Sequence, residues 1–178
     1  MSSALQSSLE AGAVTITAEV MPPRGGDASH ALEMARGLKG HVHAVNVTDG
    51  SRAVMRMSSL AVARLLLEEG IEPVLQMACR DRNRIAIQAD LLGAHALGIR
   101  NLLCLTGDPV RAGDQPKARP VNELESVRLL QQVTAFNRGD DPVKGELADG
   151  PTDIFAGAAA DPQCASSVSY THLRAHET

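Results

Sequence analysis

Short apolar runs alternate with longer stretches of helical periodicity along most of this chain. Four runs rich in β-branched and other apolar residues begin near positions 14, 44, 73 and 100. Their spacing of about 30 residues is the length of one strand and helix unit. A fifth run begins at Ile154. The pattern predicts a βα repeat with parallel strands over residues 14–19, 44–48, 73–78, 99–106 and 154–160, and with helices over residues 29–38, 58–69, 122–137 and between Asn83 and Gly98.

The densest signals fall between Cys79 and Pro109. Asn83 is suited to cap a helix whose apolar residues recur at i, i+4, i+7 and i+11, and Gly98 suits its C-terminal end. These apolar residues are Ile85, Ala89, Leu92 and Ala96. The strand that follows is apolar without alternation in its second half, as expected where both faces of a parallel sheet are covered. Asp108 comes directly after it, at the end of the strand where α/β proteins bind ligands, and is therefore a candidate site residue.

Length and connections set limits on the domain organisation. With 178 residues the chain has about the length of one domain, whereas a complete (β/α)8 barrel usually takes ~250 residues. Long polar connections over residues 110–120 and 138–151 are typical of functional loops. We expect residues 1–13 to lead into one partial barrel over residues 14–164. Residues 165–178 lack any periodicity, and we expect them to be a non-native or disordered tail.

Composition narrows the class of partner. A net charge of −4 with interspersed acids and bases, one Tyr, two Phe and no Trp provide neither a basic stripe nor stacking platforms, which argues against nucleic acid. The N-terminus lacks a signal-peptide pattern and no run of ~18 apolar residues occurs, so we expect a cytoplasmic protein without a membrane segment. Three cysteines without close pairing or a histidine at metal spacing argue against a disulfide framework and against a metal site.

An acid ends or follows each predicted strand. These acids are Glu19, Asp49, Asp81, Asp108 and Asp161. For Asp49 and Asp161, capping of the next helix is at least an equally good interpretation. Glu19 stands at the end of its strand before Pro22 and Pro23, so we expect a desolvated carboxyl suited to general acid chemistry.

A charged loop follows the third predicted strand. Arg80, Arg82 and Asn83 at a helix start could hold a phosphate or a carboxylate, while an ion pair with Asp81 is an equal alternative. The glycine signatures of Rossmann and P-loop sites are missing, which argues against dinucleotide binding in those styles. Three histidines fall away from the acid-rich edge, and we assign them no catalytic role: His41, His43 and His95.

Five motifs occur in the order and at the spacing of a known family. They are AEVMPPR at 18–24, VNVTDG at 45–50, CRDRNR at 79–84, LTGDP at 105–109 and FAGAAADP at 155–162. Together they make residues 14–162 resemble the methylenetetrahydrofolate reductase family. The resemblance implies the N-terminal part of a (β/α)8 TIM barrel, about five βα units, with FAD at the carboxyl ends of the strands. The implied reaction is reduction of 5,10-methylenetetrahydrofolate to 5-methyltetrahydrofolate by NADH or NADPH, in one-carbon metabolism and methionine biosynthesis.

The resemblance assigns roles to individual residues. Glu19 matches the family's general acid, which assists opening of the folate imidazolidine ring, and Asp108 matches the acid beside the flavin and pterin rings. The implied cofactor-binding residues are Thr48, Gly107, Asp108, Ala158 and Ala159. The candidate contacts for an anion or for the substrate are Arg80, Asn83 and Gln76, the last of which stands where many members have a flavin-side His.

The chain departs from better-known members of the family, which indicates a divergent branch. Thr106 replaces an Arg, and Ala18, Val20 and Met21 stand around Glu19 where those members have Phe. The electron donor stays open between NADH, NADPH and a partner flavoprotein or ferredoxin, and so does assembly into a homo-oligomer. Because strands six to eight of the family barrel are missing from these 178 residues, we expect the chain to be inactive alone.

Two other functions remain open. A pterin-dependent methyltransferase that passes a methyl group to a corrinoid would share the barrel and need no flavin. A non-catalytic partner subunit of a reductase complex would keep the barrel for assembly. Retention of both Glu19 and Asp108 favours an enzyme over the partner subunit.

Overall fold

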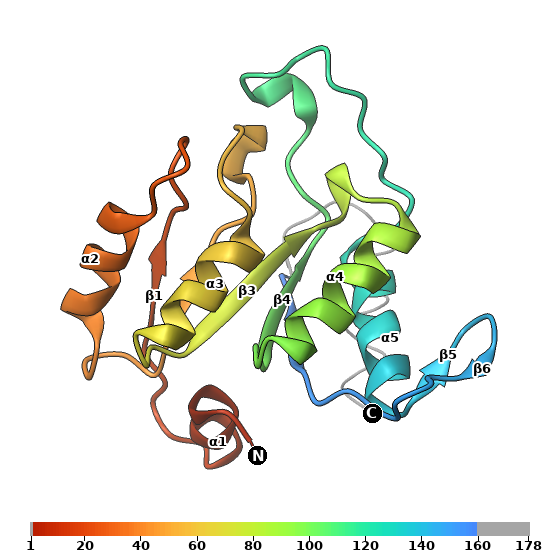
Figure 1. Ribbon diagram of the computed structural model, residues 1–178, viewed down its shortest axis with the longest axis horizontal. Helices are drawn as coiled ribbons and strands as arrows, with labels where there is room; N and C mark the ends of the chain where they lie inside the picture. The colour runs from red at the N-terminus through yellow and green to blue at the C-terminus, as the bar shows by residue number, and fades with distance from the viewer. Residues whose placement is uncertain (1, 160–178) are drawn as a thin grey trace.

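A single parallel sheet organises the computed structural model, which describes residues 2–159 (Figure 1). The strand order is β1-β2-β3-β4-β7, and every neighbouring pair is parallel. The strands are β1 (Thr17–Val20), β2 (Ala44–Val47), β3 (Pro73–Ala78), β4 (Asn101–Leu105) and β7 (Phe155–Ala158). The predicted βα repeat is therefore confirmed. β1 begins three residues later and ends one residue later than the sequence indicated, and β4 is two residues shorter at its start and one at its end.

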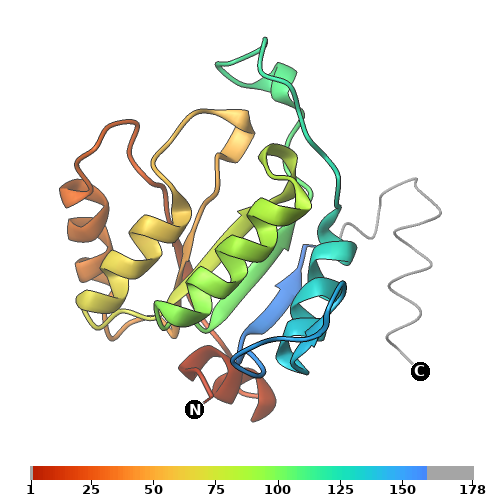
Figure 2. The same ribbon diagram turned by 45° about the vertical axis from the view of Figure 1, so that its right-hand side comes forward.

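Four helices connect consecutive strands and cover one face of the sheet (Figures 1 and 2). They are α2 (Ser29–Leu38), α3 (Ser59–Glu68), α4 (Arg84–Ala96) and α5 (Ser126–Asn137). Three single 3-10 turns follow β2, β3 and β4 at their carboxyl ends: η1 (Ser51–Ala53), η2 (Cys79–Asp81) and η3 (Val110–Ala112). Strands on the inside and helices on one outer face form a partial TIM barrel of the α/β class.

The hydrophobic core lies between the sheet and these helices. β3 is buried at every position, since it has a strand on either side and helices over one face, and Val74 on the other face packs against Leu5 near the N-terminus. Strand residues that face the helices include Val45, Val47, Leu75, Met77 and Cys104, and they pack against helix residues that include Ala35, Leu66, Ile87, Leu91 and Val133. Burial of these side chains explains the apolar runs without alternation in the sequence.

Helix α4 buries a different stripe from the one predicted. Ile85 is 76% exposed and Leu92 is 41% exposed, whereas Ile87 and Leu91 are fully buried. The sequence RIAIQADLLGAHA contains apolar residues at helical spacing in two overlapping registers, and periodicity alone does not say which one meets the sheet. The predicted helix itself and its cap are confirmed, since the Asn83 side chain accepts a hydrogen bond from the Ala86 N–H at 2.9 Å.

An N-terminal helix, α1 (Ala4–Glu10), covers the other face of the sheet at the amino ends of the strands. Leu5 packs there in a small cluster with Ala44 and Val74. The carboxylate of Glu72 accepts the N–H groups of Ala4 and Leu5, at 2.7 and 2.9 Å. The sequence pattern did not predict this helix, whose seven residues are too few to show a clear period.

The connection after α5 is also more ordered than expected. It contains a two-stranded antiparallel hairpin, β5 (Asp140–Asp141) and β6 (Gly145–Glu146), on the side of α5 away from the carboxyl ends of the large sheet (Figure 1). The predictions for Ala160, for Asp161 and for residues 165–178 lie outside the described residues. Among the helices of the described part, none has the length and apolar character needed to cross a membrane.

Candidate functional site

A cavity of about 300 Å³, here called the mouth cavity, opens at the carboxyl ends of β3, β4 and β7. Strand ends and the loops after them line it with Gln76, Thr106, Gly107, Asp108 and Ala159, among others. Its volume is at the lower limit of ordinary small-molecule sites and suits one ring system better than a whole dinucleotide. The acid-rich edge predicted from the sequence therefore borders a cavity.

Glu19 lies beside the mouth cavity and is joined to it through Gln76. The side-chain amide of Gln76, itself only 8% exposed, donates a hydrogen bond from Nε2 to Glu19 Oε2 at 3.3 Å. Glu19 is exposed, so the expected desolvation of its carboxyl is wrong for the described structure. The reason is its position: β1 is an edge strand, and Glu19 faces away from the helices that bury the next residue, Val20.

Asp108 follows β4 and reaches across to the β2–α3 loop. Its Oδ2 accepts the backbone N–H of Arg52 at 2.6 Å. The preceding Gly107 has a φ of +96°, and a Cβ added there would lie 2.8 Å from the Cβ of Arg80. Only glycine fits this turn, which therefore brings the Asp108 backbone close to η2.

The predicted small and hydroxyl residues divide between the two faces of the sheet. Thr48 is 2% exposed, and its Oγ1 has no hydrogen-bond partner in the described structure. Ala159 lines the mouth cavity. Ala158 instead packs against the core under the helices, because neighbouring residues at the end of β7 point to opposite faces. The expectation that Ala158 would lie beside a cofactor is therefore not supported by its position.

Asp49 and Arg82 form a partly buried ion pair that sequence reasoning missed. Arg82 Nη1 lies 2.6 Å from Asp49 Oδ2, Arg82 Nε lies 2.9 Å from Asp90 Oδ2, and Asp49 also accepts the N–H of Ala78 at 2.8 Å. Burial lowers the pKa of Arg82, but the two carboxylates raise it more, so the guanidinium stays charged. The order of the strands could have indicated this pair, since Asp49 and Arg82 follow β2 and β3, which are neighbours in the sheet.

Arg80 and Asn83 are occupied by contacts within the chain. Arg80 pairs with Asp81 through Nε at 2.8 Å and Nη2 at 2.5 Å, which confirms the ion-pair interpretation, and this hydrogen bonding raises the pKa of Arg80 above its usual value. The amide oxygen of Asn83 caps α4. Arg80 lines the mouth cavity, whereas Asn83 does not. Because both side chains are already hydrogen-bonded within the chain, neither is free to bind an anion in the described structure.

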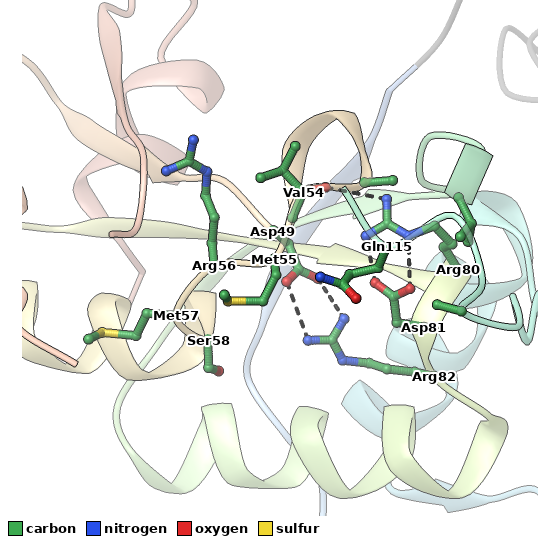
Figure 3. A pocket seen from close by; sticks show the side chains of 14 residues that line it. Asp49, Val54, Met55, Arg56, Met57, Ser58, Arg80, Asp81, Arg82 and Gln115 are labelled. Atoms are coloured by element: carbon green, nitrogen blue, oxygen red, sulfur yellow. Dashed lines mark hydrogen bonds and ion pairs between the residues drawn. The ribbon is translucent and has the colours of Figure 1, made fainter. Parts of the chain in front are cut away.

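A second cavity, of about 450 Å³, lies on the other side of Asp49 and Arg80 (Figure 3). Three loops build it, the ones after β2, β3 and β4, and its lining includes Met55, Met57 and Gln115. Arg56 points away from Arg80 in this view and donates a hydrogen bond to the carbonyl oxygen of Pro22 at 3.0 Å. The sequence pattern marked the connection over residues 110–120 as a functional loop, and it contributes Gln115 to this cavity, but no motif predicted that the irregular segments would enclose a space.

The residues at the mouth fit a flat ring that carries hydrogen-bonding groups on its edges. Gln76, Asp108 and Gly107 line the cavity together with Ala159, whose small side chain leaves room for close approach of a ring to the backbone. Thr48, at the carboxyl end of β2, does not line this cavity, but its buried hydroxyl lacks a partner in the described structure. A flavin ring has this shape and these edges. Among the described residues, no group of three His, Cys, Asp or Glu side chains could hold a metal ion.

The sheet order, the helices on one face and the acid-bearing mouth define the chain as a partial TIM barrel with a cavity at the carboxyl ends of its strands. A family model described as methylenetetrahydrofolate reductase matches residues 4–155. The chain therefore belongs to the methylenetetrahydrofolate reductase family, which confirms the resemblance drawn from the five motifs. A comparison with curated proteins gave no match.

Proposed function

We propose that this protein reduces 5,10-methylenetetrahydrofolate to 5-methyltetrahydrofolate, with FAD as cofactor and a reduced nicotinamide nucleotide as electron donor. Family membership suggests a folate-related reductase function in one-carbon metabolism. The observation that carries the finer proposal is the shared mouth: Gln76 binds Glu19 and lines the same cavity as Asp108. One acid, Asp108, thus lines a space that suits a flat ring, and the other, Glu19, is hydrogen-bonded to a residue that lines it.

Each residue of the mouth has a chemical task in this proposal. Glu19 would protonate a nitrogen of the folate imidazolidine ring, which opens the ring to an electrophilic iminium carbon. Gln76 would hold the Glu19 carboxyl toward the cavity. Thr48 and Asp108 would bind the edges of the flavin, and Asp108 would also set the charge beside the pterin. FAD, once bound and reduced by the electron donor, would supply the hydride that the iminium carbon accepts.

These residues do not select one electron donor over another, and they do not determine the state of assembly. NADH, NADPH and a partner flavoprotein or ferredoxin would all reduce a flavin whose open face is reached from the mouth. The methyltransferase and partner-subunit alternatives differ from the reductase in one simple respect, since neither requires the chain to bind and reduce a flavin.

Flavin retention and reduction test the proposed function. The protein for this test is the completed barrel: residues 1–159 of this chain joined to the helix that follows the fifth strand, and to the three βα units after it, from a complete member of the family. This brings the described five strands to eight. We expect it to purify with bound FAD and to lose its flavin colour when NADH or NADPH is added anaerobically. A colourless protein that methylates a corrinoid would replace the proposal by the methyltransferase, and a colourless protein without either activity would favour the partner subunit.

A further inference from the structure

We propose that Arg80 is a positioning residue, which ties the two mouth loops together and thereby sets the place of the Asp108 carboxylate. The two loops follow β2 and β4 and contribute Gly50 and Asp108. The relevance of this role to catalysis rests on the proposed function, in which Asp108 binds the flavin. The contacts that define the role do not depend on that function.

The guanidinium of Arg80 joins three segments at once. Its side chain is only 5% exposed. Two of its nitrogens bind Asp81, and the third, Nη1, donates to the carbonyl oxygens of Gly50 and Asp108, both at 3.3 Å. A guanidinium has a fixed planar fork, so holding it on Asp81 also fixes the direction of Nη1. The ion pair with Asp81 therefore orients the group that holds both loops.

Two glycines leave the space that the Arg80 side chain occupies. A Cβ added to Gly50 would lie 2.7 Å from Arg80 Nη2, and one added to Gly107 would lie 2.8 Å from Arg80 Cβ. Both glycines have positive φ, +55° and +96°. The carbonyl oxygen of Arg80 accepts the N–H of Val121 at 2.8 Å, which fastens the far end of the β4–α5 loop as well. Arg80 is thus enclosed by the loops that it binds.

The β2–α3 loop needs such contacts because its backbone is strained. Arg52 and Ala53 have φ values of +57° and +56°, a region that residues with a Cβ rarely adopt. The Arg52 N–H is held by Asp108 Oδ2 at 2.6 Å, and the Gly50 carbonyl two residues earlier is held by Arg80. Arg80 therefore acts on Asp108 by two routes, through the Asp108 carbonyl and through the loop whose N–H binds the carboxylate.

Hydrogen exchange of the Arg52 amide, followed by NMR in the intact chain, tests this role. Arg80→Lys keeps the charge but loses the fork, and Asp108→Asn weakens the acceptor of the Arg52 N–H. We expect each variant to speed exchange of the Arg52 amide about tenfold, the change expected for one hydrogen bond of ordinary strength, and the double variant to exchange no faster than the faster single one. A matched control is Arg84→Lys, since Arg84 is an exposed arginine paired with Glu123.

Other outcomes separate positioning from general support of the fold. The proposal would be overturned if Arg80→Lys speeds hydrogen exchange equally at the Arg52 amide and at the β3 amides. It would also be overturned if the Arg52 amide is unprotected from exchange in the unmodified chain. If Arg80→Lys fails to fold, Asp81→Asn frees the fork from its orienting partner and is expected to expose the Arg52 amide without affecting β3; no change there would also overturn it. If the Arg52 amide responds as expected but FAD binding by the completed barrel is the same with and without Arg80→Lys, the positioning role stands and the proposed function loses support.

Discussion

Glu19 has an exposed carboxyl and, within the described part of the chain, one hydrogen bond, from Gln76 at 3.3 Å. A carboxyl of this kind has room to meet a substrate nitrogen, and the folate itself would shield it from water. We predict that Glu19→Gln in the completed barrel lowers the reductase rate by about 10²–10⁴, the usual contribution of a general acid, and leaves FAD binding unchanged. Steady-state kinetics with methylenetetrahydrofolate measure this.

The control for Glu19 is Glu33→Gln, which changes an exposed acid on α2 far from the mouth and should keep the full rate. Equal rates for Glu19→Gln and Glu33→Gln would remove Glu19 from the mechanism.

Cys79 and Cys104 lie in the core and behave as buried apolar residues. Burial raises the pKa of Cys79 from 9.0 to about 11 and that of Cys104 to about 12. Both thiols ionise more easily in the unfolded chain, so the free energy of unfolding should fall as the pH rises from about 9 toward 11. Urea unfolding across this range measures the fall, and Cys79→Ala should make it smaller. A free energy of unfolding that is constant over this range would contradict the burial of the thiols.

At the scale of the element, α1 depends on Glu72. This carboxylate accepts two N–H groups at the start of the helix and also the side-chain amide of Asn101 at 3.0 Å. We predict that Glu72→Ala lowers the free energy of unfolding by about 1–3 kcal/mol, because these donors lose a charged partner. Glu72→Gln, which keeps an acceptor oxygen, should cost less. Urea unfolding followed by circular dichroism measures both variants, and equal stabilities for Glu72→Ala and the unmodified chain would show that α1 is not anchored there.

The elements also show how far the sequence leads. Strands, helices 29–38 and 58–69 and the cap at Asn83 follow from local spacing, and so does the acid-bearing edge, because parallel strands place their ends together. The buried side of α4 could not be predicted, since two apolar registers compete and only the sheet chooses between them. The exposure of Glu19 and the packing of Ala158 against the core also depend on where each residue lies in the sheet. A sequence motif does not show either position.

At the scale of the whole molecule, β1 and β7 are the edges of the described sheet. Their outer N–H and C=O groups have no further strand to pair with in the described part of the chain, and much of the face away from the helices is uncovered beyond α1. We predict that the 178-residue chain alone binds the dye ANS, has low stability and shows no turnover, whereas the completed barrel binds less ANS. Fluorescence titration and urea unfolding compare the two proteins. A chain that excludes ANS and unfolds cooperatively at high urea would contradict this.

The central claim is that Glu19 and Asp108 serve one reaction at one mouth. The most direct test is an anaerobic stopped-flow measurement, in which completed barrel with pre-reduced FAD is mixed with 5,10-methylenetetrahydrofolate. We predict that the flavin is reoxidised in a single turnover with formation of 5-methyltetrahydrofolate, and that Glu19→Gln and Asp108→Asn each slow this step. Two results would contradict the account: flavin that stays reduced in the presence of the folate, or flavin that both variants reoxidise at the rate of the unmodified protein.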